Sequence, residues 1–145
     1  MKGLLCICVA MLFACSDTGT GSTTFISGDL TVAGNPVILG ENATGGANPS
    51  GFLRISGNFD SKLGLALTGL KANVRVMNAS GAVIGSGLAA CSPDAIGPAS
   101  SCTFLAVIAL VSNAYTDSRQ VEITPISDQG TGTLRVISVN WPTTG

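Results

Sequence analysis

The chain has 145 residues, with seven basic, eight acidic and no histidine side chains, and a formal net charge of −1. Without histidine, Ser-His-Asp and Cys-His catalytic arrangements and nearly all catalytic zinc sites are excluded. The basic residues are scattered and form no run, which argues against nucleic-acid binding and against a polybasic membrane patch. We therefore expect no enzyme, no cofactor and no metal.

The first fourteen residues have the pattern of an export signal. Lys2 precedes an apolar stretch from Leu4 to Ala14, which as a helix spans only about 16 Å against the roughly 30 Å of a hydrocarbon core. Its end, Leu12-Phe13-Ala14-Cys15, resembles the lipobox at which bacterial lipoproteins are acylated on cysteine and then cleaved. The resemblance implies a signal peptide over residues 1–14 and a membrane-attaching lipid on Cys15. The alternatives are an ordinary cleaved signal peptide and a buried strand of a cytosolic protein.

Residues 15–24 are predicted to form a lipidated, flexible tether. Ser16 to Thr24 contains two glycines and no large apolar residue, so it cannot bury enough surface to offset the entropy of ordering. Two or three acyl chains on Cys15 would anchor the chain stably. The expected location is the bacterial cell envelope. Ser16 stands where aspartate would resemble an inner-membrane retention signal, which favours the outer membrane in a host with two membranes.

Cys91 and Cys102 remain as an even pair once Cys6 and Cys8 leave with the leader. In an oxidising compartment such a pair is expected to form a disulfide, which would close a short loop and stabilise the fold by about 3 kcal/mol. A zinc site or a redox centre is the alternative. Two thiols without histidine make a poor zinc site, and the spacing is not C-x-x-C.

Residues 25–145 are predicted to form one all-β domain. Their period-two alternation, interrupted by turn residues, predicts strands at 26–32, 36–39, 53–59, 63–67, 74–77, 82–84, 121–124 and 134–141. Thr103 to Val111 is apolar on both faces, and we predict a strand covered on both sides in preference to a buried helix. The spacing favours an immunoglobulin-like β-sandwich of about seven to nine antiparallel strands over a barrel.

The order of features from Ser56 to Pro125 resembles the FxLYD-type immunoglobulin-like domains of bacterial envelope proteins. The resemblance is carried by Gly57-Asn58, the hairpin Val74–Ile84, Ile96-Gly97-Pro98-Ala99 with Phe104, and Val121-Glu122-Ile123. It implies an immunoglobulin-like fold in an adhesion, spacer or interaction module, and it carries over no catalytic residue.

A few polar groups and one aromatic are candidates for a site. Asp94 and Asp117 could form the carboxylate pair of a glycosidase, but solvated loop acids are the preferred interpretation. The stretch Asp128 to Gly132 weakly suggests a calcium or phosphate loop. It lacks the alternating acids of the first and the lysine of the second, so a hairpin turn is preferred. Trp141 is expected to be a core or edge plug and not a ligand platform.

These observations favour a membrane-anchored, non-catalytic binding or structural module of the cell envelope. We expect a protein partner, possibly the chain itself, bound through loops or an exposed sheet edge. A more specific form of this hypothesis is a filament subunit in which the strand from Phe25 to Ala33 completes the fold of the next copy. The alternatives are a small-ligand or glycan-binding lipoprotein using the loop Asn42–Ser50, and a periplasmic inhibitor or immunity lipoprotein using the Cys91–Cys102 loop as an insertion arm.

Overall fold

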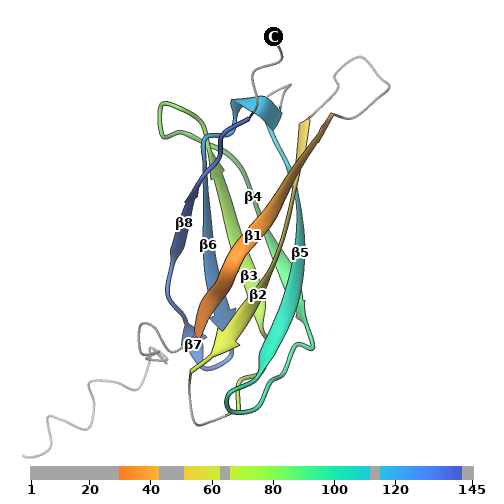
Figure 1. Ribbon diagram of the computed structural model, residues 1–145, viewed down its shortest axis with the longest axis vertical. Helices are drawn as coiled ribbons and strands as arrows, with labels where there is room; N and C mark the ends of the chain where they lie inside the picture. Colours follow the sequence, from red (N-terminus) through yellow and green to blue (C-terminus); the bar gives the residue numbers. More distant parts are fainter. Residues whose placement is uncertain (1–29, 43–50, 63–65, 112–114, 142–145) are drawn as a thin grey trace, which may run out of the picture.

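The computed structural model describes residues 30–42, 51–62, 66–111 and 115–141 (Figure 1). Within these ranges the chain forms eight antiparallel strands and one 3-10 turn, which confirms the predicted all-β fold and its strand number. In chain order the elements are β1 (Leu30–Asn42), β2 (Gly51–Ser61), β3 (Lys71–Met77), β4 (Val83–Ser92), β5 (Ser101–Ala109), η2 (Tyr115–Asp117), β6 (Gln120–Ser127), β7 (Gly130–Thr131) and β8 (Arg135–Ser138).

The strands form two facing layers that are joined along one side. The first layer is β1-β2-β5, and the second is β4-β3-β6 with β7 and β8 both paired to β6. Strand β4 pairs with β3 over most of its length, and then Cys91 and Ser92 pair with Phe104 and Thr103 of β5. The result is an immunoglobulin-like β-sandwich that is nearly closed, in a barrel-like way, through β4.

Strand β1 is one long strand, although the sequence predicted two short ones over 26–32 and 36–39. It pairs with β2 on both sides of a register shift, with Ala33 opposite Asn58 and Val37 opposite Ser56. Three residues, 34–36, therefore face the single residue Gly57, and this bulge keeps the strand continuous while bending it away from β2. Of the segment that was predicted to exchange between copies, Leu30 to Ala33 pairs with the chain's own β2, and residues 25–29 lie outside the described part.

The hairpin between β3 and β4 forms where the sequence predicted it. The Asn78 side-chain oxygen accepts hydrogen bonds from the backbone N–H groups of Ser80 and Ala82, each at 3.0 Å. Gly81 has a φ of 79°, a conformation that side chains other than hydrogen strongly disfavour. The predicted strand at 121–124 is also confirmed within β6, whereas the centre of the one predicted at 63–67 lies outside the described residues.

Inward-facing residues of both layers make one core. The rings of Phe59 and Phe104 stack with centroids 4.8 Å apart, and both are buried. A Cβ on Gly57 would lie 2.9 Å from the Phe104 ring, so only glycine fits beneath it. Cys91 and Cys102 form the predicted disulfide beside these rings, where β4 joins β5.

Strand β5 corrects one expectation. Thr103 to Val111 was predicted to be a strand covered on both sides, and the structure does place a strand there. Its burial alternates strictly, however: Phe104, Ala106 and Ile108 are buried, while Leu105 and Val107 are 60% and 53% exposed. The run is apolar on both faces, yet within the described chain only the inner face has a cover.

Candidate functional site

The outer side of the first layer carries an apolar surface. Val37 and Leu39 of β1 are 58% and 57% exposed, and Leu105 and Val107 of β5 lie on the same side of the sheet. We call these four residues the apolar face. Strand β2 runs between the two pairs and contributes Arg54 and Ser56, which the pairing register places between them. Clustered exposed apolar side chains of this kind are typical of interaction surfaces.

The outer side of the second layer is polar by comparison. Arg75 of β3 forms an ion pair of 3.1 Å with Glu122, the residue opposite it on β6. The large exposed apolar residues of β4 and β8 are Val83, Leu88 and Val136. Leu88 and Val136 lie at opposite margins, separated by β3 and β6. Single apolar residues at such positions are ordinary. The two outer faces therefore differ in their chemistry.

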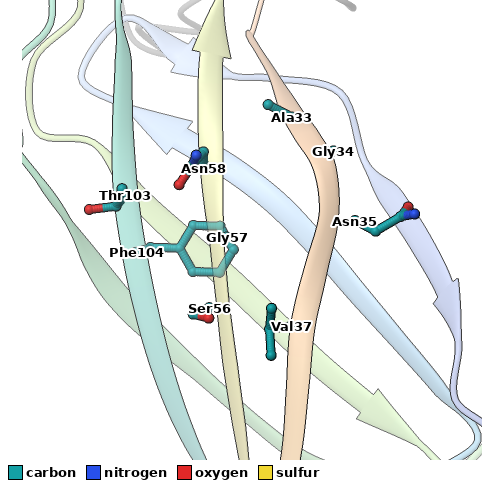
Figure 2. Close-up of a pocket in the computed structure, with 9 residues that line it drawn as sticks. All are labelled: Ala33, Gly34, Asn35, Val37, Ser56, Gly57, Asn58, Thr103 and Phe104. Atoms are coloured by element: carbon teal, nitrogen blue, oxygen red, sulfur yellow. The ribbon is translucent and has the colours of Figure 1, made fainter.

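A hollow of about 440 Å³ lies beside the apolar face, at the bulge of β1 (Figure 2). Among the described residues that line it, none is charged; the polar ones include Asn58 and Thr103, and Val37 adds an apolar side. Phe104 also contributes, but its ring is 97% buried and extends beneath Gly57, so it offers no free face to a ligand. The chemistry of this hollow suits neutral groups and provides no aromatic platform.

The acidic candidates from the sequence do not come together. Asp94 lies in the connection from β4 to β5 and Asp117 in η2, at opposite ends of the sandwich (Figure 1). They therefore cannot flank one sugar bond as a glycosidase requires. Asp128 lies in the predicted turn after β6, where its carboxylate accepts a hydrogen bond of 2.7 Å from Thr68. Gln129 also bonds Thr68, so this turn is tied to the connection before β3.

Trp141 is a half-buried plug at one end of the core, as the sequence predicted. Its ring meets Tyr115 edge to face with centroids 4.9 Å apart, and both pack against the core. No aromatic side chain in the described part of the chain is classed as exposed. A stacking platform for sugars is therefore missing from the described surface.

The loop closed by the disulfide is held against the body of the domain. The backbones of Leu67 and Ile96 exchange hydrogen bonds of 2.8 and 2.9 Å, and Leu70 donates to the Asp94 carbonyl at 2.9 Å. The Ile96 side chain is buried. This loop is a packed part of the sandwich and not a projecting arm. Cys15 and the loop over residues 43–50, two other sites predicted from the sequence, lie outside the described residues.

The apolar face is the surface that the sequence interpretation missed. The pattern that signals it is the run from Thr103 to Val111, which is apolar on both faces. Such a run also fits a strand covered on both sides, because period alone cannot show which face of a strand meets solvent. The second pair, Val37 and Leu39, was assigned to a separate short strand.

A scan against models of known protein families finds no match to this chain, and a search of curated proteins finds no similar protein. The described residues contain no helix that is long and apolar enough to cross a membrane. They also contain no group of three or more carboxylate or thiol side chains placed to hold a metal ion.

Proposed function

We propose that this protein is a lipid-anchored module of the bacterial cell envelope, without catalytic activity, that binds a protein partner through the apolar face. The single observation behind the binding role is the exposure of Val37, Leu39, Leu105 and Val107 together on one side of the sandwich. Burying a Val or Leu side chain contributes about 1.5–3 kcal/mol, so four half-exposed ones are a substantial driving force for docking.

The proposed anchoring rests on the amino terminus and is supported by the chemistry of the domain. The leader ends in the lipobox-like Leu12-Phe13-Ala14-Cys15, and a polar segment follows it. The disulfide between Cys91 and Cys102 suits an oxidising compartment outside the cytoplasm. Together they support export followed by acylation of Cys15.

The alternative functions have less support in the structure. A glycan-binding role would use the neutral hollow beside β1, but its one aromatic residue, Phe104, is buried. An inhibitor that inserts the disulfide loop would need that loop to project, and Ile96 holds it against Leu67. A binding module that uses a sheet surface needs neither an exposed aromatic residue nor a projecting loop.

Metabolic labelling with palmitate tests the anchor. We expect the chain expressed in a bacterial host to incorporate label, and the Cys15→Ser chain to incorporate none. Retention of the label in Cys15→Ser, or no label in either chain beside a labelled control lipoprotein, would refute acylation at this position.

A charge placed on the apolar face tests the binding role. The tagged chain is recovered from solubilised envelope, and the amount of co-purified partner is compared among variants. Leu105→Arg should lower it by at least about tenfold, because it buries a charge in the interface. Leu88→Arg is the matched control, since Leu88 is 65% exposed on the other layer. Equal recovery with both variants would contradict a role for the apolar face.

A further inference from the structure

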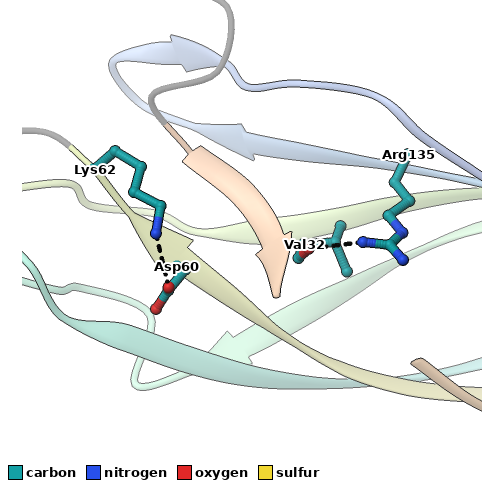
Figure 3. Close-up of polar contacts among 4 residues, drawn as sticks. All are labelled: Val32, Asp60, Lys62 and Arg135. Atoms are coloured by element: carbon teal, nitrogen blue, oxygen red, sulfur yellow. Dashed lines mark hydrogen bonds and ion pairs between the residues drawn. The ribbon is translucent and has the colours of Figure 1, made fainter. Parts of the chain in front are cut away.

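Strand β1 ends the strand order and leaves one of its edges without a partner strand in the described part of the chain. The first half of that edge is blocked. Thr133 donates a backbone hydrogen bond of 3.1 Å to the Leu30 carbonyl, and the Arg135 guanidinium reaches the Val32 carbonyl at 3.3 Å (Figure 3). The bulge with Pro36 follows. Bulges, prolines and covering side chains are the devices that keep sheet edges from pairing with other chains.

The second half of β1, Val37–Asn42, has none of these devices among the described residues. It is regular, pairing residue by residue with β2 from Val37 to Asn42. From Thr31 to Gly40 the strand carries no charged residue. On its inner side the Tyr115 ring packs against Gly40, so this half is held in place by the core. This half is a regular edge with Val37 and Leu39 exposed, and its one charged residue is Glu41.

We infer that Val37–Glu41 pairs, antiparallel, with the same five residues of a second copy of this chain. The inference goes beyond the proposed partner binding, because Leu105 and Val107 lie outside the paired strands, and it rests on the proposed function only for the shared membrane anchor. An antiparallel pair of identical strands is two-fold symmetric, so a single edge is complementary to itself. With the two-fold axis at Leu39, the six strands β5-β2-β1-β1-β2-β5 become one sheet. Leu39 then lies opposite Leu39 of the second copy, and Val37 lies diagonally beside it.

Charge and membrane attachment both permit this pairing. The nearest charge along β1 itself is at Glu41, and the backbones of its two copies would be four positions apart along the paired strands, about 14 Å. This exceeds the Debye length of about 8 Å at physiological salt, so their repulsion is largely screened. A five-residue edge buries less than a standard interface, but anchoring both copies in one membrane raises their effective concentration.

Cysteine cross-linking in the envelope tests the pairing. The full chain carrying Leu39→Cys is expressed in a bacterial host and treated with a short bis-maleimide, and dimer is measured on a gel. Directly opposed residues have Cβ atoms about 4.5–5.5 Å apart, so most of the chain should become dimer. Leu105→Cys is the matched control on the same face, with 60% exposure against 57% for Leu39. Its two copies would lie five strand spacings, or about 24 Å, apart, and under about a tenth should cross-link.

The outcomes distinguish a failure of edge pairing from a failure of the proposed function. Dimer with Leu39→Cys and little with Leu105→Cys supports edge pairing. Dimer with Leu105→Cys alone means that the faces stack, which overturns edge pairing and retains a self-binding apolar face. No dimer with either variant, or an adduct to a different protein at position 39, overturns the second copy as partner. Dimer formed by the parent chain, which carries no added cysteine, would show that Cys15 has a free thiol, and this contradicts the proposed anchor. Edge pairing is then tested by the same cross-linking in a chain that carries Cys15→Ser together with Leu39→Cys.

Discussion

Reduction of the Cys91–Cys102 disulfide should measurably destabilise the domain. The bond joins β4 to β5, the place where the two layers meet, and both sulfur-bearing side chains are buried. Reduction leaves both side chains in place, so it opens no large cavity. The main expected effect is on the unfolded chain, which regains the freedom that the cross-link removes.

The magnitude follows from the length of the closed loop. The two cysteines are 11 positions apart. For a loop of this size the chain-entropy relation gives a loss of about 3 kcal/mol in the free energy of unfolding at 25 °C. With a urea m-value of about 1–3 kcal/mol per molar, the unfolding midpoint should fall by about 1–3 M.

Urea unfolding of the Cys15→Ser chain without its leader, followed by circular dichroism with and without reductant, measures this fall. The Cys91→Ala/Cys102→Ala double variant serves as control, because reductant should not move its midpoint. A fall of less than about 1 kcal/mol on reduction would refute the loop-entropy reasoning. It would mean that the hydrogen bonds holding Ile96 and Asp94 already restrict the loop when the chain is unfolded.

Three further substitutions test contacts that shape the domain. Gly40→Ala should cost about 1–3 kcal/mol of unfolding free energy, because the new Cβ would overlap the Tyr115 ring; urea unfolding measures it. Arg135→Ala should cost about 1 kcal/mol and speed amide hydrogen exchange in the first half of β1, because the Val32 carbonyl loses a charged donor. Asn78→Ala should cost about 1 kcal/mol in thermal unfolding, because its side-chain oxygen accepts two backbone hydrogen bonds in the hairpin turn.

Two control substitutions accompany these. Ser86→Ala, on the exposed side of β4, should change stability by less than about 0.5 kcal/mol. Asn78→Asp keeps the acceptor oxygen and should retain most of the turn's stability. A Gly40→Ala chain as stable as Ser86→Ala would show that the Tyr115 ring moves freely. Exchange that stays slow throughout β1 in Arg135→Ala would mean that its edge is held by other contacts.

Local patterns in the sequence were enough to predict several elements. The alternation in Leu53 to Phe59 predicts β2, because a strand with one buried face must place apolar residues at every second position. The Asn78–Gly81 turn was predictable because its residues supply a side-chain acceptor and a positive φ within four positions. The disulfide was predictable because Cys91 and Cys102 remain as a pair when Cys6 and Cys8 are assigned to the expected leader and Cys15 to the expected lipid.

Other features depend on contacts between segments far apart in the chain. Asp94 and Asp117 are only 23 positions apart, yet the path of β5 carries them to opposite ends of the sandwich. Residues 34–36 form a bulge within one strand because β2 continues on both sides of it and pairs with each half. No local pattern encodes either result, since both follow from which strands become neighbours.

The composition and periodicity of this chain predict its all-β class and a disulfide between Cys91 and Cys102, and they exclude histidine chemistry, because each depends on residue type or on neighbours in the sequence. Which side of β5 meets solvent, and that Leu105 lies on the same surface as Val37, are decided only when the strands assemble. The two faces of that strand are equally apolar in the sequence, and only packing against the second layer makes them different.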